Sequence, residues 1–345
     1  MVRGRRMSGG KLRAFIDLSR VHGSPIITGF FLAGMLSGAA VPHVSYFILA
    51  AVVGFLFKSA GSVHNELLDL DMDARDPVLR KKPIQAGIIS RREARGYLAG
   101  CLLAGTAASL LFFPPVVTGL VLLAAGLIFF YNALGKFVPV AYEMLFAASM
   151  AILVIAGAFL AGGAGKLTYV LAFTVFCANL LAQWLNGCRD IETDRPAGVA
   201  SLPALFEGRP DGRTLTALSG AAIWTLFTGS LLLPFLLSVL GAVYLPWTLG
   251  IHAGISFHLF RGLPAASSRR AFNRLLVVQV VAFWLIVPVF LVDAAGWAAV
   301  FGLCLFTMLG TVVAIAAEKA TQYKLAFSGR DAGSGMVRAG GGVDG

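Results

Sequence analysis

The stretch KSAGSVHNELLDLDMDARD, residues 58–76, joins the end of an apolar segment to a run of acidic side chains. The polar residues Lys58, Ser62, Asn65, Asp69 and Asp73 stand at relative positions 0, 4, 7, 11 and 15. At about 3.6 residues per turn, these positions fall within one narrow face of a helix. The sequence therefore predicts a polar stripe at the end of an otherwise apolar helix.

A second stretch, NLLAQWLNGCRDIETDRPAG at residues 179–198, repeats this pattern 121 positions later. The residues at the matching positions are Asn179, Gln183, Asn186, Asp190 and Asp194. Gly87 and Gly208 match at the same offset. The two stripes predict an internal duplication, and repeats of this kind often place a binding site at their interface.

The composition indicates a membrane protein. Of the 345 residues, 58% are hydrophobic and only 13% are charged, whereas a soluble protein carries about 25% charged residues. A spanning helix needs about 20 mostly apolar residues. The candidate spans are 22–41, 44–64, 97–113, 115–135, 139–162, 167–187, 214–233, 235–258, 273–292 and 296–317. We expect an all-α, polytopic transmembrane bundle of ten spans, or nine if the last two stretches form one span and a re-entrant piece, around a central cavity.

The basic residues predict the orientation of this bundle. With ten spans, 26 of the 28 Lys and Arg residues lie on one side, Lys166 lies opposite, and Lys58 lies inside a span. By the positive-inside rule the charged side faces the cytoplasm. We therefore expect an integral, multi-pass protein of the cell inner membrane whose cavity opens to the cytoplasm. The net charge of +11 is then a topology signal and does not indicate nucleic-acid binding.

Three regions follow from this pattern. Residues 1–21 form a basic N-terminal segment expected to lie at the membrane interface, and residues 22–317 form the transmembrane domain. Residues 318–345 form a cytoplasmic, Gly-rich tail that we expect to be disordered. The four cysteines show no CxxC spacing, so the sequence indicates neither a disulfide framework nor a zinc site.

Two facing carboxylate pairs beside basic residues suit a metal-bound diphosphate. Mg²⁺ takes one or two carboxylates together with phosphate oxygens. The cations placed to neutralise the remaining phosphate charge are Lys58, Arg80, Lys82 and Lys136. A diphosphate at the membrane surface with its chain among apolar helices points to an isoprenyl diphosphate donor. Loss of the diphosphate would leave an allylic carbocation, which aromatic faces stabilise.

Glu143 lies about one turn into the fifth predicted span, near Lys136. An intramembrane carboxylate suits a catalytic base that accepts the proton of the acceptor. A surface ion pair with Lys136 explains the residue equally well.

The motifs together resemble the signatures of the UbiA superfamily of intramembrane prenyltransferases. The first signature is K-x-x-G-x-x-x-N-E-x-x-D-x-x-x-D followed by K-P-I-x-x-G over residues 58–87. The second is the DxxxD run within Asn186–Pro203, and YNALGK at Tyr131–Lys136 is similar to a Tyr/Lys element of the family. The resemblance covers about residues 12–317. The sequence departs from the signature at Glu66, where Asp is usual, and at Lys82, where Arg is usual.

The resemblance implies a Mg²⁺-dependent prenyltransferase and a role for each matching residue. The residues implied to hold Mg²⁺-diphosphate and to carry catalysis are Asn65, Asp69, Asp73, Asp190 and Asp194. The implied substrate-binding residues are Lys58, Asn65, Arg80, Lys82, Tyr131, Lys136, Asn186 and Arg189.

The motifs leave the acceptor open, because they resemble members that use quinone precursors, chlorophyll precursors and phosphoribosyl lipids. We expect a lipophilic, quinone-type aromatic acceptor. The alternatives are a phosphoribosyl or glycerol phosphate acceptor and a terpene cyclase without an acceptor. An alternative of another class is a transporter of an anionic lipid, since internal repeats and intramembrane polar residues also suit transport.

Overall fold

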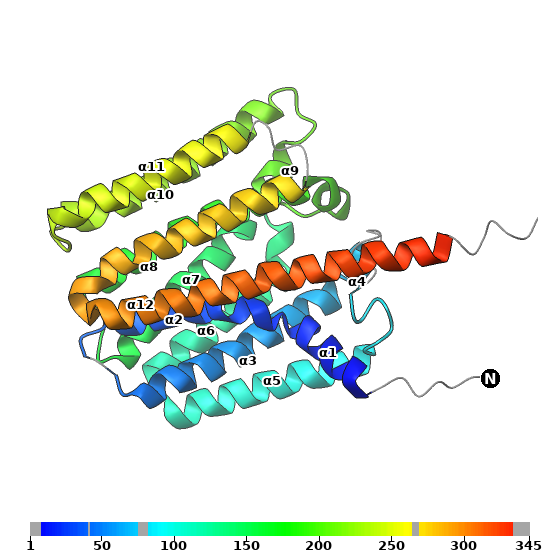
Figure 1. Ribbon diagram of the computed structural model, residues 1–345, viewed down its shortest axis with the longest axis horizontal. Coiled ribbons are helices and arrows are strands. Elements are labelled where there is room, and N and C mark those ends of the chain that lie inside the picture. Colours follow the sequence, from blue (N-terminus) through cyan, green and yellow to red (C-terminus); the bar gives the residue numbers. More distant parts are fainter. Residues whose placement is uncertain (1–7, 41, 75–81, 264–268, 334–345) are drawn as a thin grey trace, which may run out of the picture.

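The computed structural model describes residues 8–40, 42–74, 82–263 and 269–333, and within these ranges the regular structure is entirely helical. Figure 1 shows long helices packed side by side. The α-helices are α1 (Ser8–Ser19), α2 (Ser24–Leu36), α3 (Val44–Leu68), α4 (Leu70–Asp73), α5 (Arg91–Phe112), α6 (Pro115–Ala133), α7 (Ala141–Leu160), α8 (Lys166–Asp194), α9 (Leu202–Phe206), α10 (Gly212–Leu236), α11 (Leu245–Gly262) and α12 (Arg269–Gly333).

Seven helices of the described chain are long and apolar enough to cross a membrane. They supply the segments 44–68, 91–112, 115–133, 141–160, 166–192, 212–236 and 272–310. The apolar helix α2 is shorter. The protein is therefore an integral, multi-pass membrane protein, as its composition predicts.

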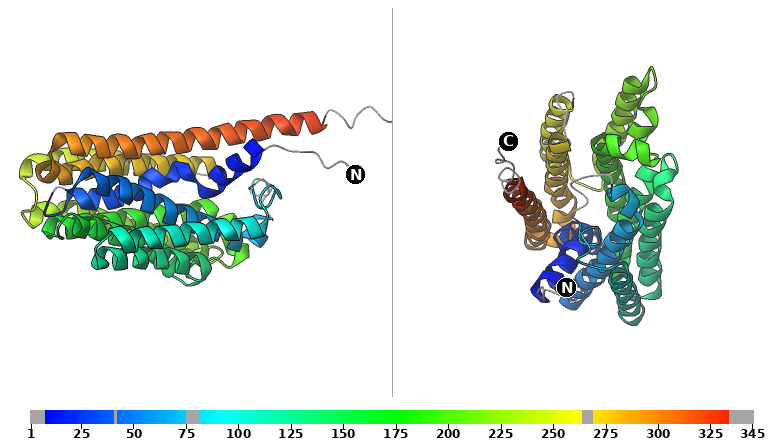
Figure 2. Two further views of the ribbon diagram at one scale, coloured as in Figure 1. Left: turned by 90° about the horizontal axis from the view of Figure 1, so that it is seen from below. Right: turned by 90° about the vertical axis from the view of Figure 1, so that its right-hand side faces the viewer.

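Helix α12 is two antiparallel arms rather than one rod. Its backbone leaves helical values at Gly296, where φ is 78°. The thiol of Cys304 lies 3.5 Å from the carbonyl oxygen of Trp284, twenty positions earlier, so the chain reverses between them. Figures 1 and 2 show the second arm returning along the bundle. This arm stays helical to Gly333, beyond position 318, where the sequence predicts a disordered tail.

The turn after the seventh predicted span lies farther along the chain than the sequence predicts. The sequence suggests a turn at Pro234, but α10 passes through Pro234 to Leu236 and α11 begins at Leu245. A proline inside a helix leaves the carbonyl four residues earlier without its donor. That carbonyl belongs to Ser230, and it lies 3.2 Å from Thr174 Oγ1 of α8, whose single hydroxyl proton it shares with the Val170 carbonyl at 3.0 Å. The neighbouring helix thus allows α10 to continue.

The predicted duplication is visible in the backbone. Gly87 and Gly208 have φ of 69° and 79°, and both precede a long helix, α5 and α10, whose first residues Arg91 and Gly212 are again 121 positions apart. Both glycines occupy the left-handed region that other residues rarely adopt. Matching backbone conformations at matching positions indicate that the two halves share one architecture.

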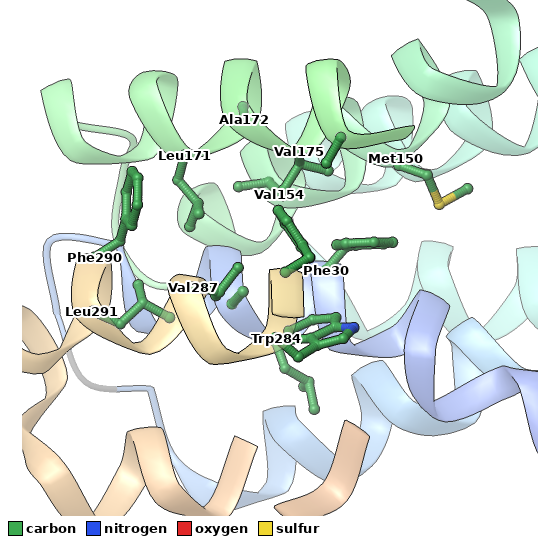
Figure 3. Close-up of a cluster of buried hydrophobic side chains, with 14 of the residues drawn as sticks. Phe30, Met150, Val154, Leu171, Ala172, Val175, Trp284, Val287, Phe290 and Leu291 are labelled. Carbon is green, nitrogen blue, oxygen red and sulfur yellow. The ribbon is translucent and has the colours of Figure 1, made fainter. Parts of the chain in front are cut away.

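The main core joins the two halves. Phe30 of α2 stacks on Trp284 of α12, with ring centroids 5.3 Å apart. Figure 3 shows these rings beside Val154 of α7 and Leu171 of α8. Helices α2 and α7 cross at Gly34, where an added Cβ would overlap the backbone of Val154. This close approach fixes α7 and α8 against the first half of the bundle.

A smaller cluster holds the charged end of the molecule together. Leu18 of α1, Val63 of α3 and Ile89, which precedes α5, are all fully buried in it. Helix α5 starts at a capping box in which Ser90 and Glu93 bond each other's backbone N–H groups. These contacts hold α1 and the residues before α5 over the acidic end of α3.

Candidate active site

A cavity of about 920 Å³ lies among α2, α3, α6, α7 and α8. One end is lined by carboxylates, amides and cations, and the other by apolar and aromatic side chains. Along α3 the lining extends from Ala50 to Asp69, a rise of about 28 Å at 1.5 Å per residue. The cavity is therefore long, with a polar head and an apolar body.

The first acidic stripe runs along α3 into α4. The backbone departs from helical values at Asp69, yet the N–H of Asp73 still bonds the carbonyl of Asp69 at 2.7 Å. The Asp69 carboxylate accepts two hydrogen bonds from Lys136 Nζ, both at 2.8 Å, and one from Asn65 Nδ2 at 2.8 Å. Lys136 comes from the turn after α6, so this pair joins two distant segments across the polar end.

Asp73 forms the next pair along the stripe. Its Oδ2 accepts a hydrogen bond from Lys82 Nζ at 2.5 Å. Burial raises the pKa of Asp73 above its usual value, and Lys82 only partly offsets this effect. Asp73 is 4% exposed, so the loss of water around the carboxylate outweighs the attraction of the lysine.

The second stripe ends α8. Asp190 accepts from the adjacent Arg189 guanidinium, whose Nη1 also donates to Asn273 Oδ1 at 3.1 Å. Asp194 lies just beyond the apolar segment 166–192 and is buried, and its Oδ2 has no hydrogen-bond partner. Burial, together with the charges of Asp190 and Asp69, raises the pKa of Asp194 to about 7, against the lowering effect of Lys136 and Arg189.

The two acidic helix ends meet at one site. All four aspartates line the same cavity, and Asp69 of the first stripe acts electrostatically on Asp194 of the second. This is the arrangement that the duplicated spacing predicts. Bringing four ionised carboxylates together costs free energy unless cations lie nearby, because like charges in a partly dehydrated site disfavour ionisation.

The donor set suits a metal that arrives with phosphate. Within the described ranges, no three carboxylate, imidazole or thiolate groups lie close enough to hold an ion between them. Mg²⁺ instead takes one or two carboxylates and fills its other positions with waters and phosphate oxygens. The unpartnered Asp194 Oδ2 and the carboxylates on both sides of the cavity fit that mode of binding.

Two further cations line the cavity, and neither forms a salt bridge with a carboxylate of the described residues. Lys58 Nζ donates to Ser62 Oγ at 2.5 Å, one turn away on α3. Arg20, before α2, has a left-handed backbone with φ of 48° and ψ of 48°. A non-glycine residue in this region costs free energy, which indicates that the surrounding structure holds it there. Arg20 and Lys58 repel one another electrostatically, so together they suit an anion.

The structure brings most of the predicted site residues together. Those that line the cavity are Lys58, Asn65, Asp69, Asp73, Lys82, Tyr131, Lys136, Asn186, Arg189, Asp190 and Asp194. Arg80 lies outside the described residues. Asn179, which matches Lys58 in the second stripe, is buried outside the lining and its Nδ2 bonds the carbonyl of Val175 at 2.8 Å. The duplicated stripes are thus unequal at their inner ends.

The structure places Glu143 outside the lining of this cavity. It is 1% exposed and does not line the cavity. Its Oε1 accepts the backbone N–H of Leu202, at the start of α9, at 2.8 Å. The alternative of an ion pair with Lys136 is not formed either, because Lys136 bonds Asp69. Helical position predicts depth in the membrane, but it does not say which neighbouring segment a side chain faces.

Sequence reasoning missed the walls of the apolar body. Phe31, Phe57, Phe113, Phe129 and Phe146 line it, from four helices and the end of α5. With 26 phenylalanines in an apolar chain, no pattern separates those that face the cavity from those that face lipid. Arg20 and Glu192 also line the polar end, and the spacing of the two stripes predicts neither contact.

Fold and site define the class of protein. A helical membrane bundle that holds carboxylates and cations at one end of a long apolar cavity suits chemistry on a phosphorylated lipid. A family model for the UbiA prenyltransferase family matches residues 25–275. The chain belongs to the UbiA prenyltransferase family.

Solved structures share the fold. One described in a study of digeranylgeranylglyceryl phosphate synthase matches with a TM-score of 0.64 and 18% identity, over 83% of this chain and 99% of the other. A UbiA homolog from Aeropyrum pernix K1 in the apo form has a TM-score of 0.61 and 21% identity, over 77% and 97% of the two chains. A UbiA homolog from Archaeoglobus fulgidus bound to GPP and Mg²⁺ has a TM-score of 0.60 and 18% identity, over 79% and 99%. No curated protein matches the chain by sequence.

Proposed function

We propose that this protein transfers an isoprenyl group from an isoprenyl diphosphate, bound with Mg²⁺, to a lipophilic acceptor within the membrane. The observation that carries the proposal is the convergence of Asp69, Asp73, Asp190 and Asp194 at the mouth of one apolar cavity. Family membership and the similar fold of a homolog bound to GPP and Mg²⁺ support the donor and the metal.

The cations at the polar end would bind the diphosphate. In the part of the chain that the structure describes, Lys58 and Arg20 form no salt bridge, and Lys82 and Lys136 each pair with an aspartate that is also a candidate metal ligand. With those aspartates serving as metal ligands, Lys82 and Lys136 would be free to contact phosphate oxygens. Arg189, which pairs with Asp190 on the opposite wall of the cavity, would change partner from carboxylate to phosphate in the same way.

Mg²⁺ held by the aspartates and Asn65 would supply charge stabilisation for the leaving diphosphate. The bond between C1 of the donor and the bridging oxygen breaks, and its electron pair leaves with the diphosphate. The protein's contribution is to hold the lysines and Arg189 against that developing negative charge.

Aromatic side chains lie where the positive charge develops. Tyr131 faces Tyr142 and Phe146, with ring centroids 5.7 Å and 6.1 Å away, and all three line the cavity. Their faces stabilise an allylic cation and exclude water, which would otherwise capture it. The acceptor donates an electron pair to C1 and then loses a proton, which we assign to the departing diphosphate.

We further propose that the bundle has nine or ten crossings, with the charged end in the cytoplasm and the protein in the cell inner membrane. The Lys and Arg distribution supports this orientation. Within it, residues 1–21 form an interfacial segment, 22–317 the prenyltransferase domain and 318–345 a cytoplasmic extension. The exposed Leu12 and Ile16 on α1 suit an interfacial position.

A quinone-type aromatic remains our proposed acceptor, because the cavity body is lined by aromatic and aliphatic side chains. Transport of an anionic lipid has less support. A transport path must open on the opposite side as well, and the cavity ends there at buried residues such as Phe113.

The test is turnover of purified protein in lipid nanodiscs with radiolabelled farnesyl diphosphate, Mg²⁺ and a panel of hydroxylated benzoates and naphthoates. Asp69→Ala and Asp190→Ala should each lower kcat/KM by about 100-fold or more, since each removes a carboxylate that positions the charges at the reaction centre. Asp71→Ala is the matched control, because Asp71 is exposed and does not line the cavity. Unchanged turnover in both cavity variants would reject the function.

Lipid mass spectrometry of a host with and without the gene identifies the acceptor. A prenylated aromatic product supports the quinone-type proposal. A prenylated phosphoribosyl or glycerol phosphate lipid, or a cyclised hydrocarbon, replaces it with the corresponding alternative. Counterflow of an anionic lipid in proteoliposomes without product formation would favour transport.

A further inference from the structure

The apolar end of the cavity is lined by side chains that are buried in the bundle. Ala50, Val53, Val121, Phe31 and Phe113 line it, and none is more than 6% exposed. The rings of Phe31 and Phe113 stack with centroids 5.9 Å apart and an interplanar angle of 29°. Because these residues are buried within the bundle, we take this ring pair as the apolar end of the cavity.

The walls around this end are also tight. Gly54 of α3 lies so near α2 that an added Cβ would be 2.7 Å from Thr28 Oγ1. A Cβ on Gly61 of α3 would be 3.2 Å from Ile128 of α6, and Asn132 Nδ2 bonds the Gly61 carbonyl at 3.0 Å. The seams of α3 with α2 and with α6 are thus closed at two levels, which leaves a chain in the cavity little room to leave sideways there.

The distance from the polar end to the ring pair limits the chain that fits. Ser62 and Ala50 both line the cavity, twelve residues apart on α3, a rise of about 18 Å. Each isoprenyl unit adds four bonds of about 1.5 Å, or roughly 5 Å along an extended chain. Three units fill the apolar body, and a fourth would meet the two phenylalanines.

We propose that the Phe31–Phe113 pair limits the donor to fifteen carbons, an inference that rests on the proposed function. Up to that length, each added unit removes apolar surface from water and tightens binding. Beyond it, a longer chain must displace side chains in a close-packed region, which is unfavourable. The pair is therefore a specificity determinant and not part of the reaction centre.

The experiment measures Mg²⁺-dependent binding of unreactive thiolodiphosphate analogues of ten, fifteen, twenty and forty carbons to the full chain in nanodiscs. In the unmodified protein, affinity should rise at least tenfold from ten to fifteen carbons and fall at least tenfold at twenty. Phe113→Ala should restore twenty-carbon binding at least tenfold and leave ten-carbon binding unchanged. Affinities are compared between the variant and the unmodified protein for the same analogue, so that the partitioning of that analogue into lipid cancels.

Two further variants complete the design. Val121→Phe shortens the cavity and should weaken fifteen-carbon binding at least tenfold without affecting the ten-carbon analogue. If Phe113→Ala binds no analogue, the length profile of Val121→Phe tests the chain-length limit. Phe283→Ala is the matched control, since Phe283 is a buried core phenylalanine outside the lining, and its length profile should match that of the unmodified protein.

The outcomes separate the two proposals. Equal binding of all four lengths, or a length profile that neither cavity variant changes, overturns the chain-length limit and leaves the proposed function in place. Failure of the unmodified protein to bind any analogue with Mg²⁺ overturns both.

Discussion

At the scale of single residues, the acidic side chains owe their behaviour to burial and to one another. Asp69, Asp73 and Asp190 each contact a cation, whereas Asp194 keeps one carboxylate oxygen without a partner. The carboxylate with the least compensation is the one whose pKa rises to about 7. A proton and a metal ion therefore compete for Asp194 more directly than for the other three aspartates.

This competition predicts how magnesium affinity depends on pH. Because the pKa of Asp194 is raised by burial and by Asp190, the carboxyl keeps its proton below pH 7 and must release it before it binds a cation. We expect the affinity for Mg²⁺, measured with a bound donor analogue, to fall by up to tenfold per pH unit below pH 7 and to level off above pH 8.

Asp194→Asn provides the control for this prediction. The variant should bind Mg²⁺ more weakly at high pH, and its affinity should lose the step near pH 7. A magnesium affinity that stays constant from pH 6 to 8 in the unmodified protein contradicts the assignment.

The departure from the family signature at Glu66 also has an explanation at this scale. Glu66 is 2% exposed and does not line the cavity. Its carboxylate accepts a backbone hydrogen bond from Ile84, in the segment that follows Lys82. The acidic side chain at this position therefore bonds that segment and lies outside the cavity lining.

At the scale of helices, a contact from α8 helps α10 to remain helical through a proline. Pro234 removes one backbone donor from α10, and Thr174 of α8 supplies a replacement to the Ser230 carbonyl. A buried carbonyl left without a donor costs about 1–3 kcal/mol. The straight course of α10 thus depends on a hydroxyl group in another helix.

Thr174→Val tests this dependence, since it removes the hydroxyl at nearly constant volume. We expect it to destabilise the protein by about 1–2 kcal/mol, seen as a lower Tm of the detergent-solubilised protein. The matched control is Thr225→Val, because Thr225 is exposed and its hydroxyl donates to the Ala221 carbonyl of its own helix, as the Thr174 hydroxyl does to the Val170 carbonyl. In a Pro234→Ala background, where the Ser230 carbonyl regains a backbone donor, the effect of Thr174→Val should shrink. An equal loss in both backgrounds would rule out this role.

At the scale of the whole molecule, the basic residues predict which end faces the cytoplasm. Cysteine labelling tests this in a variant in which Cys101, Cys177, Cys188 and Cys304 are replaced. Lys166 and Glu207 are both exposed and stand at the two ends of the bundle by sequence. A membrane-impermeant maleimide should label Lys166→Cys on intact cells and Glu207→Cys only after permeabilisation. The reverse pattern would invert the proposed topology.

Much of the architecture follows from the sequence because bilayer thickness and helical periodicity act locally. Apolar length predicts the helices, and the spacing of Asp69, Asp73, Asp190 and Asp194 predicts two acidic helix ends. The offset of 121 residues predicts that the two ends belong to equivalent helices. None of these inferences requires knowledge of which helix packs on which.

What the sequence could not supply depends on contacts between distant segments. Only the tertiary structure pairs Lys136 with Asp69, turns Glu143 toward Leu202 and stacks Phe31 on Phe113. In an apolar chain, side chains that face lipid and side chains that face a cavity have the same composition. Periodicity thus determined the polar head of the site, and helix packing alone decided the shape and depth of its apolar body.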